Sequence, residues 1–450
     1  FFLEWIMKND LEFGTDGIRG SVSEEGITPE FALKLGIATG ATLKSSWETV
    51  DVVIGRDTRL SGDMLASAFS SGLNQTGANV FNVGIMPSPA VAFLTKSIGA
   101  NVGVVVSASH NMFRDNGFKF FSGSGKKIPE LMEKKIQDSL KLNYAIDPCK
   151  LGVQKKIQDA DGRYIEFCKS CFPRNLSLRD KKIVLDAAHG AASFCAGKIL
   201  SELGAEVIEI GNKPNGININ DSVGTLFPQK LVDRVINVSA DFGIALDGDG
   251  DRLKLVDHLG RVYDGDELLY AITKLRVRTE GASTVKGVVG TLMSNLGLER
   301  AINKCGLEFR RAKVGDRHIL QILEENDWYL GGETSGHILS LDMHTTGDGI
   351  VSALQVLQAV ITIGDSLADF IADLQLMPQL LKNVPLIQGK NWPINEKFKK
   401  VKKRVLDELG SDGRILVRAS GTEPVIRIMA EAENQNLAQS CVDQLVSSLQ

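Results

Sequence analysis

The sequence is short of the features that mark secreted, membrane-spanning and nucleic-acid-binding proteins. Only six cysteines occur among 450 residues, which fits a reducing compartment. The net charge is -4, so no excess of positive charge favours nucleic acid, and no apolar run reaches the roughly twenty residues of a membrane span. The leader Phe1–Ile6 has no basic start and is too short for a signal peptide, so Met7 is the expected native start. We expect a cytoplasmic protein that binds neither nucleic acid nor a membrane.

Several familiar motifs are incomplete. Cys168-Lys-Ser-Cys171 has no second cysteine pair to complete a zinc site and falls late in a helical run, so a packing role is favoured over a redox role. No Gly-x-Ser-x-Gly elbow surrounds Ser109, which argues against a serine hydrolase. The stretch Ser122–Lys127 resembles a P-loop but lacks its first glycine, because Phe120 occupies that position.

What the sequence does contain is three aspartates at alternate positions. Asp247, Asp249 and Asp251 are separated by glycines and followed by Arg252. On an extended backbone alternate side chains point the same way, so these carboxylates are expected to converge. Three close anions repel one another, and a hard divalent cation bound by oxygen ligands relieves that repulsion. With only three protein ligands, the site is expected to be open to a substrate oxygen or a fourth group.

The surroundings of this triplet exclude a calcium-binding EF-hand. That loop needs glycine at its sixth position and glutamate at its twelfth, where this chain has Arg252 and His258. The flanking apolar runs, 242–246 and 253–256, predict strands rather than helices. The alternative to a metal site is an acidic turn that merely caps a hairpin.

A second candidate group surrounds Ser109. The apolar run 102–106 predicts a buried strand, and a small-residue turn after such a strand commonly presents a side chain at the mouth of an α/β sheet. Downstream, Lys119 is an isolated cation in an apolar stretch, where it either reaches water or is held partly desolvated in a site. A turn whose serine caps the following segment is the alternative for Ser109.

Two further polar clusters suit a sugar and an anion. Glu333 and Ser335, with His337, lie in a glycine-rich stretch that allows close backbone approach, and they suit the hydroxyl or amino groups of a sugar. The second cluster combines arginines, hydroxyls and a glycine on a turn, which are the parts of a phosphate cradle, although a polar hairpin remains the alternative. Its members are Arg418, Ser420, Gly421, Thr422 and Arg427.

Together these four clusters resemble the α-D-phosphohexomutase superfamily and, within it, the phosphoglucosamine mutases. The resemblance runs from Phe13–Gly20 to Arg418–Pro424, with further stretches at 214–220, 289–295, 312–317 and 345–349. It implies an α/β protein: three related α/β/α domains with mixed sheets, and a smaller C-terminal α+β domain. We place these domains at 1–158, 159–257, 258–376 and 377–450.

The resemblance also implies roles for the four clusters. Ser109 would carry phosphate and, with Asp247, Asp249 and Asp251, hold one Mg²⁺ per chain. Glu333 and Ser335 would grip the sugar, and the last cluster would anchor the phosphate that is not transferred. The part of the site where the phosphoryl group is transferred, the reacting end, would be lined by Arg19, His110, Lys119 and Arg252. Lys119, with a pKa lowered by burial or by cationic neighbours, is our first candidate for moving the proton, and His110 is the second.

The implied activity interconverts glucosamine 6-phosphate and glucosamine 1-phosphate through a phosphoserine and a sugar 1,6-bisphosphate, feeding UDP-N-acetylglucosamine synthesis. A hexose 1,6-bisphosphate would act as activator, and the protein would be a monomer or a homodimer. The chain departs from the family at Met112, where proline is usual, at His189, where asparagine is common, and at Thr334, where glutamine or asparagine is usual. A phosphomannomutase or phosphoglucomutase, a serine phosphatase and a non-catalytic sugar-phosphate sensor are therefore the alternatives.

Overall fold

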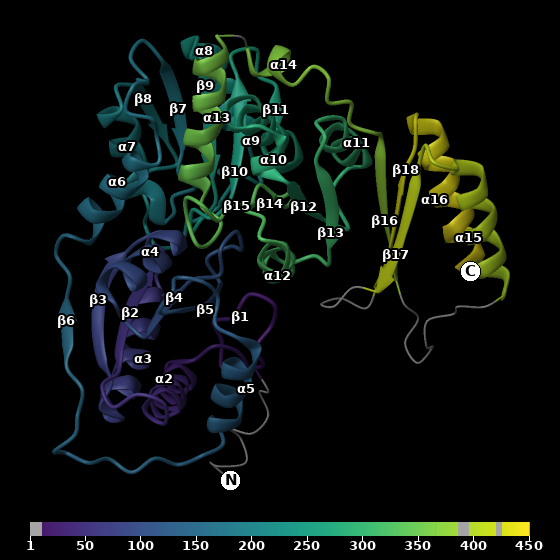
Figure 1. Cartoon of the computed structure of the whole chain (residues 1–450). Coiled ribbons are helices and arrows are strands. Elements are labelled where there is room, and N and C mark those ends of the chain that lie inside the picture. Colours follow the sequence, from purple (N-terminus) through teal and green to yellow (C-terminus); the bar gives the residue numbers. More distant parts are fainter. Residues whose placement is uncertain (1–10, 365, 386–395, 420–424, 450) are drawn as a thin grey trace.

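The computed structural model describes residues 11–364, 366–385, 396–419 and 425–449, and it shows four units that follow one another along the chain (Figure 1). Each unit is built on a β-sheet with helices against it. The expected start at Met7 lies outside the described residues. The first three units lie close together, and the last, in yellow, stands at the far end next to α11 and β13.

The first sheet is mixed and has the strand order β1-β5-β4-β2-β3-β6. Its strands β4, β2, β3 and β6 pair in parallel, whereas β5 runs antiparallel to both β4 and β1. The strands are β1 (Ile18–Ser21), β2 (Asp51–Arg56), β3 (Asn79–Ile85), β4 (Val102–Val106), β5 (Asp115–Ser122) and β6 (Gln154–Lys156). The helices are α2 (Pro29–Lys44), α3 (Gly62–Gln75), α4 (Ser88–Ile98) and α5 (Glu130–Ser139).

The second sheet is also mixed and has the order β11-β10-β9-β7-β8. Its antiparallel pair β9 and β10 flanks the aspartate loop, residues 247–252, as the sequence predicted. The strands are β7 (Lys182–Asp186), β8 (Glu206–Ile210), β9 (Phe242–Leu246), β10 (Leu253–Asp257) and β11 (Val262–Tyr263). The helical segments are α6 (Ala160–Ser170), the 3-10 turn η2 (Ala191–Phe194), α7 (Ala196–Glu202) and α8 (Gln229–Val238).

The third sheet has the order β13-β12-β14-β15, with β15 antiparallel to β14. Its first helix, α9, begins with a capping box in which Asp264 and Glu267 satisfy each other's backbone amides. The strands are β12 (Gly287–Thr291), β13 (Glu308–Ala312), β14 (Leu330–Gly332) and β15 (Ile338–Ser340). The helices are α9 (Gly265–Glu280), α10 (Ala282–Val285), α11 (Leu296–Lys304), α12 (Asp316–Asn326), α13 (Gly349–Ile363) and α14 (Leu367–Phe370).

The last unit is an antiparallel sheet of order β16-β18-β17 covered by two helices on one face (Figure 1). Its strands are β16 (Gln379–Pro385), β17 (Arg414–Ala419) and β18 (Val425–Glu431), and its helices are α15 (Glu396–Leu409) and α16 (Gln435–Leu449). Phe398 of α15, Ile428 of β18 and Leu445 of α16 belong to a separate buried core. The expected fold class, three α/β/α domains and a smaller α+β domain, is confirmed.

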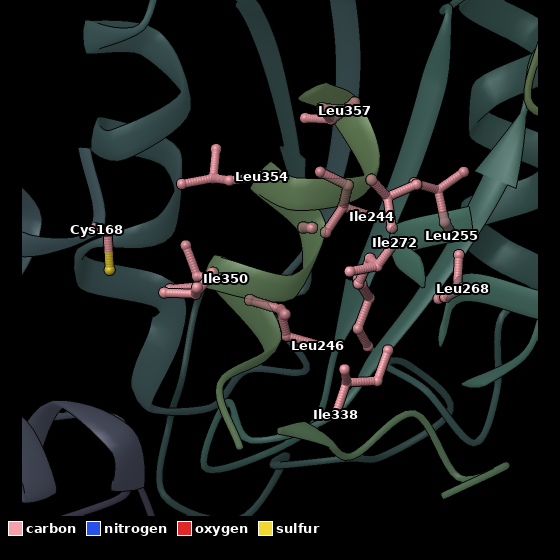
Figure 2. Packing of buried hydrophobic residues seen from close by; sticks show 14 of the residues in the cluster. Cys168, Ile244, Leu246, Leu255, Leu268, Ile272, Ile338, Ile350, Leu354 and Leu357 are labelled. Carbon is pink, nitrogen blue, oxygen red and sulfur yellow. The ribbon is translucent and has the colours of Figure 1, made fainter. Parts of the chain in front are cut away.

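One apolar core runs through the first three units and fixes their relative positions. Figure 2 shows Ile244 of β9, Ile272 of α9, Leu354 of α13 and Cys168 of α6 within this core. Cys168 is buried in this core and Cys171 packs against it, which agrees with the packing role expected for the pair. Among the described residues, no helix is long and apolar enough to cross a lipid bilayer.

Candidate active site

Ser109 and the three aspartates meet where the first and second sheets face each other. Ser109 follows β4, and its Oγ donates a hydrogen bond of 2.7 Å to Asp247 Oδ2. Asp247, Asp249 and Asp251 are buried, and one carboxylate oxygen of each lies within 4.8 Å of the others. Side chains that are separated by 138 positions in the sequence therefore form one cluster.

The aspartates converge through a turn and not through the extended backbone expected from their spacing. Gly250 N donates to Asp247 O at 3.1 Å, and Gly250 has a φ of +73°, which a residue with a side chain rarely adopts. Asp247 Oδ1 then accepts hydrogen bonds from the backbone amides of Asp251 and Arg252, both at 3.1 Å. The expectation of an extended loop is wrong, because these bonds close the loop on itself.

The carboxylate oxygens of this cluster fit a divalent cation. Asp249 Oδ1 and Asp251 Oδ1 are buried without a hydrogen-bond partner among the residues that the structure describes. Burial, followed by repulsion from Asp251 and Asp249, raises the pKa of Asp247 well above its usual value. Buried carboxylate oxygens without a hydrogen bond are costly, and a hard cation with oxygen ligands would satisfy them.

Lys119 of β5 reaches the same carboxylates. Its Nζ lies 2.7 Å from Asp249 Oδ2, 3.0 Å from Asp251 Oδ2 and 3.3 Å from Asp16 Oδ2. Burial lowers the pKa of Lys119, but the attraction of these three carboxylates raises it well above its usual value. The expectation of a lowered lysine pKa is therefore wrong for this arrangement, since carboxylates and not cations surround the ammonium group.

The other residues expected at the reacting end lie in the same region. Burial, then the positive charges of Arg252 and Arg19, lower the pKa of His110 to about 4, so its ring is neutral at pH 7. Its Nδ1 is buried and has no hydrogen-bond partner within the described part of the chain. Arg252 Nε lies 4.0 Å from Asp251 Oδ1, and Arg19 is ion-paired with Asp16.

The glycine-rich cluster of the third unit folds back onto the aspartate loop. Glu333 Oε1 accepts from Gly315 N at 3.0 Å, and Glu333 Oε2 accepts from Ser335 Oγ at 3.1 Å. Leu253 N, directly after the aspartate loop, donates to Gly336 O at 3.1 Å. The structure thus brings the expected sugar-binding side chains next to the expected metal ligands.

His337 lies between two carboxylates. Its Nδ1 is 3.7 Å from Asp251 Oδ1, and its Nε2 is 3.5 Å from Asp316 Oδ2. Burial lowers the pKa of His337, but Asp251 and Asp316 raise it well above its usual value. The imidazole contacts an aspartate of the loop, and its assignment to substrate binding stays a prediction.

The fourth cluster lies in the last unit, away from the other three. Arg418 of β17 stands directly opposite Arg427 of β18 in the antiparallel ladder. Like charges in this position repel, and burial together with Arg427 lowers the pKa of Arg418, so an anion held here would offset the repulsion. Ser420, Gly421 and Thr422 lie outside the described residues.

Sequence reasoning missed a buried arginine that holds the segment 107–115 around Ser109, the serine loop. The Arg59 guanidinium donates to main-chain oxygens of that loop, namely those of Ser109, Asn111, Met112 and Asp115. Its Nε donates to Asp57 Oδ2 at 2.8 Å, and both side chains are fully buried. The signal in the sequence is an acid and a base directly after the apolar strand β2.

The same aspartate holds the other side of the loop. Asp57 Oδ2 accepts from Ser107 Oγ at 2.6 Å, and Ser107 Oγ accepts from Ser109 N at 2.9 Å. Asn220, from the second unit, donates to the Ser109 carbonyl at 2.9 Å. Ser109 has a φ of +51°, a left-handed conformation that persists only where its surroundings enforce it. These bonds supply that enforcement.

Comparison with known proteins agrees with this geometry. Models of the phosphoglucomutase/phosphomannomutase family match along the chain: alpha/beta/alpha domain I at residues 10–145, domain II at 162–260, domain III at 264–377 and the C-terminal domain at 381–448. The chain belongs to the phosphoglucomutase/phosphomannomutase family. Its recognition from sequence as a phosphohexomutase is therefore confirmed.

Within the phosphoglucomutase/phosphomannomutase family, similar curated relatives share one name. The phosphoglucosamine mutase of Albidiferax ferrireducens is 51% identical over 97% of this chain and 98% of its own length, and that of Acidovorax ebreus is 50% identical over the same shares. Solved structures share the fold: a phosphoglucomutase/phosphomannomutase family protein from Burkholderia thailandensis has a TM-score of 0.82 at 24% identity, covering 98% of both chains. The N-acetylphosphoglucosamine mutase of Aspergillus fumigatus, in complex with GlcNAc-6P and magnesium, has a TM-score of 0.66 at 16% identity, covering 97% of this chain and 95% of its own.

Proposed function

We propose that this chain is a phosphoglucosamine mutase, an intramolecular phosphotransferase that interconverts glucosamine 6-phosphate and glucosamine 1-phosphate. The observation that carries the chemistry is the hydrogen bond between Ser109 and Asp247 inside a buried aspartate cluster. The choice of an amino sugar as substrate is supported by relatives about 50% identical in sequence that are named phosphoglucosamine mutase. The product would feed UDP-N-acetylglucosamine synthesis.

The serine would carry the phosphoryl group between two positions of one sugar. Phosphorylated Ser109 gives its phosphoryl group to the free hydroxyl of a sugar monophosphate: the bond from phosphorus to Ser109 Oγ breaks and a bond to the sugar oxygen forms. The sugar bisphosphate then turns end over end and returns its other phosphoryl group to Ser109. A hexose 1,6-bisphosphate would phosphorylate the serine at the outset. Transfer of this kind depends mostly on positioning and on electrostatic stabilisation.

Asp247, Asp249 and Asp251, together with phosphorylated Ser109, would hold one Mg²⁺. The two carboxylate oxygens without a hydrogen-bond partner among the described residues are the support for this assignment. When bound, the cation would offset negative charge on the phosphoryl oxygens and on the departing oxygen. Before Ser109 is phosphorylated, its hydrogen bond to Asp247 keeps the serine loop and the second unit in contact.

His110 is our first candidate to take the proton of the sugar hydroxyl, because its buried Nδ1 has no hydrogen-bond partner among the described residues. Burial and the charges of Arg252 and Arg19 lower its pKa to about 4, so the ring is neutral at pH 7 and a weak base. Lys119, held between carboxylates, is a charged hydrogen-bond donor to those groups in this arrangement. This reverses the order of preference that the sequence suggested, and Lys119 remains as a source of positive charge beside the transferred group.

The remaining site residues complete the proposal. Glu333 and Ser335 would bind the sugar, and a carboxylate suits the 2-ammonium of glucosamine. Arg418 and Arg427 would anchor the other phosphate together with Ser420, Gly421 and Thr422. The domain limits 1–158, 159–257, 258–376 and 377–450, a cytoplasmic location and a monomeric or dimeric state stay part of the proposal.

The test compares sugars and serine variants in one assay. Glucosamine, glucose and mannose 6-phosphates are each supplied with Mg²⁺ and a trace of hexose 1,6-bisphosphate, and formation of the 1-phosphate is followed. We expect the highest kcat/KM with glucosamine 6-phosphate, and loss of turnover in Ser109→Ala but not in the control Ser124→Ala, which removes an exposed hydroxyl. Preference for mannose or glucose would favour the alternative mutases, release of free phosphate would indicate a phosphatase, and full activity of Ser109→Ala would end the mechanism.

A further inference from the structure

A ring of alternating acidic and basic side chains, partly exposed at Asp16 and Asp316, lies at the reacting end. Neighbours in the ring are joined by nitrogen-to-oxygen distances between 2.6 and 3.7 Å. The first, second and third units each contribute members. In order around the ring, the members are Asp16, Lys127, Asp316, His337, Asp251 and Lys119.

Lys127 occupies the side of the ring opposite the aspartate loop. Its Nζ lies 2.6 Å from Asp16 Oδ1 and 2.6 Å from Asp316 Oδ1, and it also donates to Thr15 O at 3.3 Å. Lys127 is the last residue of the stretch that resembles a P-loop, and the side chain is only 11% exposed. The lysine therefore ties a turn of the first unit to the first residue of α12 in the third unit.

The two carboxylates that Lys127 bridges each hold a group of the reacting end. The other oxygen of Asp16, Oδ2, contacts Lys119 Nζ at 3.3 Å, and the other oxygen of Asp316, Oδ2, contacts His337 Nε2 at 3.5 Å. Lys119 and His337 in turn both contact Asp251. Each carboxylate thus uses one oxygen for Lys127 and the other for a side chain that contacts the aspartate loop, and the second oxygen of Asp16 also pairs with Arg19.

We propose that Lys127 is a positioning residue, which orients Lys119 and His337 around Asp251 by holding Asp16 and Asp316 together across the junction of the first and third units. This inference rests on the proposed function, because it assigns Lys127 to the same reaction. In this role Lys127 acts on the reaction through its two carboxylate partners, Asp16 and Asp316.

Removal of the ammonium group would leave two carboxylates facing each other. Both oxygens lie 2.6 Å from Nζ, so they are no more than about 5 Å apart and repel strongly in a buried site. Asp16 and Asp316 would separate, and Lys119 and His337 would follow their partners. A shift of about 1 Å in groups that position a reacting atom costs on the order of 100-fold in rate.

The adjacent lysine supplies a matched control. Lys126 Nζ pairs with Glu324 of α12 across the same junction, but this pair is exposed, with side chains 37% and 46% accessible, and it is outside the ring. Lys126→Met therefore removes an ion pair between the same two units without touching the reacting end. Both variants are compared with wild-type protein in the mutase assay and in thermal unfolding.

We expect Lys127→Met to lower kcat by about 10- to 100-fold with KM within about threefold of wild type, because the phosphate-anchoring arginines are untouched. Lys126→Met should keep both constants close to wild type. Lys127→Arg, which keeps a cation that can bridge two carboxylates, should recover most of the lost kcat. If Lys127→Met does not fold, Lys127→Gln takes its place in the same comparison.

Equal kcat in the Lys127 and Lys126 variants would overturn the inference. A fall in kcat of Lys127→Met that Lys127→Arg fails to recover would overturn it as well, since a purely steric role would then explain the loss. These outcomes differ from failure of the proposed function, in which wild-type protein itself shows no conversion between the two sugar phosphates.

Discussion

Arg59→Lys is the substitution that tests most directly how the serine loop is held. The guanidinium donates to five oxygens, those of the Asp57 carboxylate and of four main-chain carbonyls in the serine loop. A lysine has three N–H donors, so at least two of these five hydrogen bonds are lost. Three of the carbonyls keep another donor, because Asn220 also donates to those of Ser109 and Asn111 and Asp115 N donates to that of Met112. A hydrogen bond to a charged group contributes about 1.5–3 kcal/mol, so the loss of two makes about 3–6 kcal/mol. The left-handed conformation of Ser109 is then no longer enforced from this side.

The expected result is a loss of both stability and turnover. Thermal unfolding should shift down by roughly 5 °C or more, and kcat should fall on the order of 100-fold if the serine moves by about 1 Å. Arg276→Lys is the control: Arg276 is also buried and bonds to Asp342 and Gln355, but it lies in α9, away from the serine loop. It should lose stability and keep its kcat. If Arg59→Lys loses stability like the control while kcat stays within about threefold of wild type, the reasoning is refuted.

Two further substitutions probe the aspartate loop and a buried acid. In Gly248→Ala the new Cβ would lie 2.6 Å from the carbonyl oxygen of Ser109, so we expect kcat to fall at least about tenfold, whereas Gly162→Ala, with nothing within 4 Å, should be neutral in the same assay. An unchanged kcat in Gly248→Ala would contradict the close contact of the two loops. Burial, followed by repulsion from Asp264, raises the pKa of Asp266 to about 7, so its contribution to stability is present below pH 4 and is lost as the pH rises through 7. Asp266→Asn should therefore flatten the fall of the free energy of unfolding between pH 4 and 8, by at most about 4 kcal/mol, and an unaltered pH profile would speak against the raised pKa.

The chemistry of the aspartate cluster and its flanking strands could be predicted because they depend on local patterns, whereas the fold class was predicted from the family resemblance. The strands that flank the aspartate loop follow from short β-branched and apolar runs, and β4 is a run of valines and one glycine that is buried throughout. The pairing of Ser109 with the aspartates was expected from the resemblance, and the hydrogen bond to Asp247 agrees with it.

Other features depend on contacts between distant segments, which spacing does not reveal. The lowered pKa expected for Lys119 was wrong, because Asp16, Asp249 and Asp251 reach the ammonium from different parts of the chain. The extended loop expected for the aspartates was wrong because a glycine with positive φ permits a turn. Arg59 gave only a weak signal, since its acceptors are backbone carbonyls, which have no mark in a sequence.

The most direct measurement of the central claim is the transfer of a labelled phosphoryl group to Ser109. The protein is incubated with Mg²⁺ and a radiolabelled hexose 1,6-bisphosphate, and the labelled residue is identified by peptide mapping. The account predicts label on Ser109, no labelling when Mg²⁺ is left out of the incubation, and transfer of the label to a sugar bisphosphate when glucosamine 6-phosphate is added. Conversion of the sugar phosphate with no label on Ser109 would contradict it.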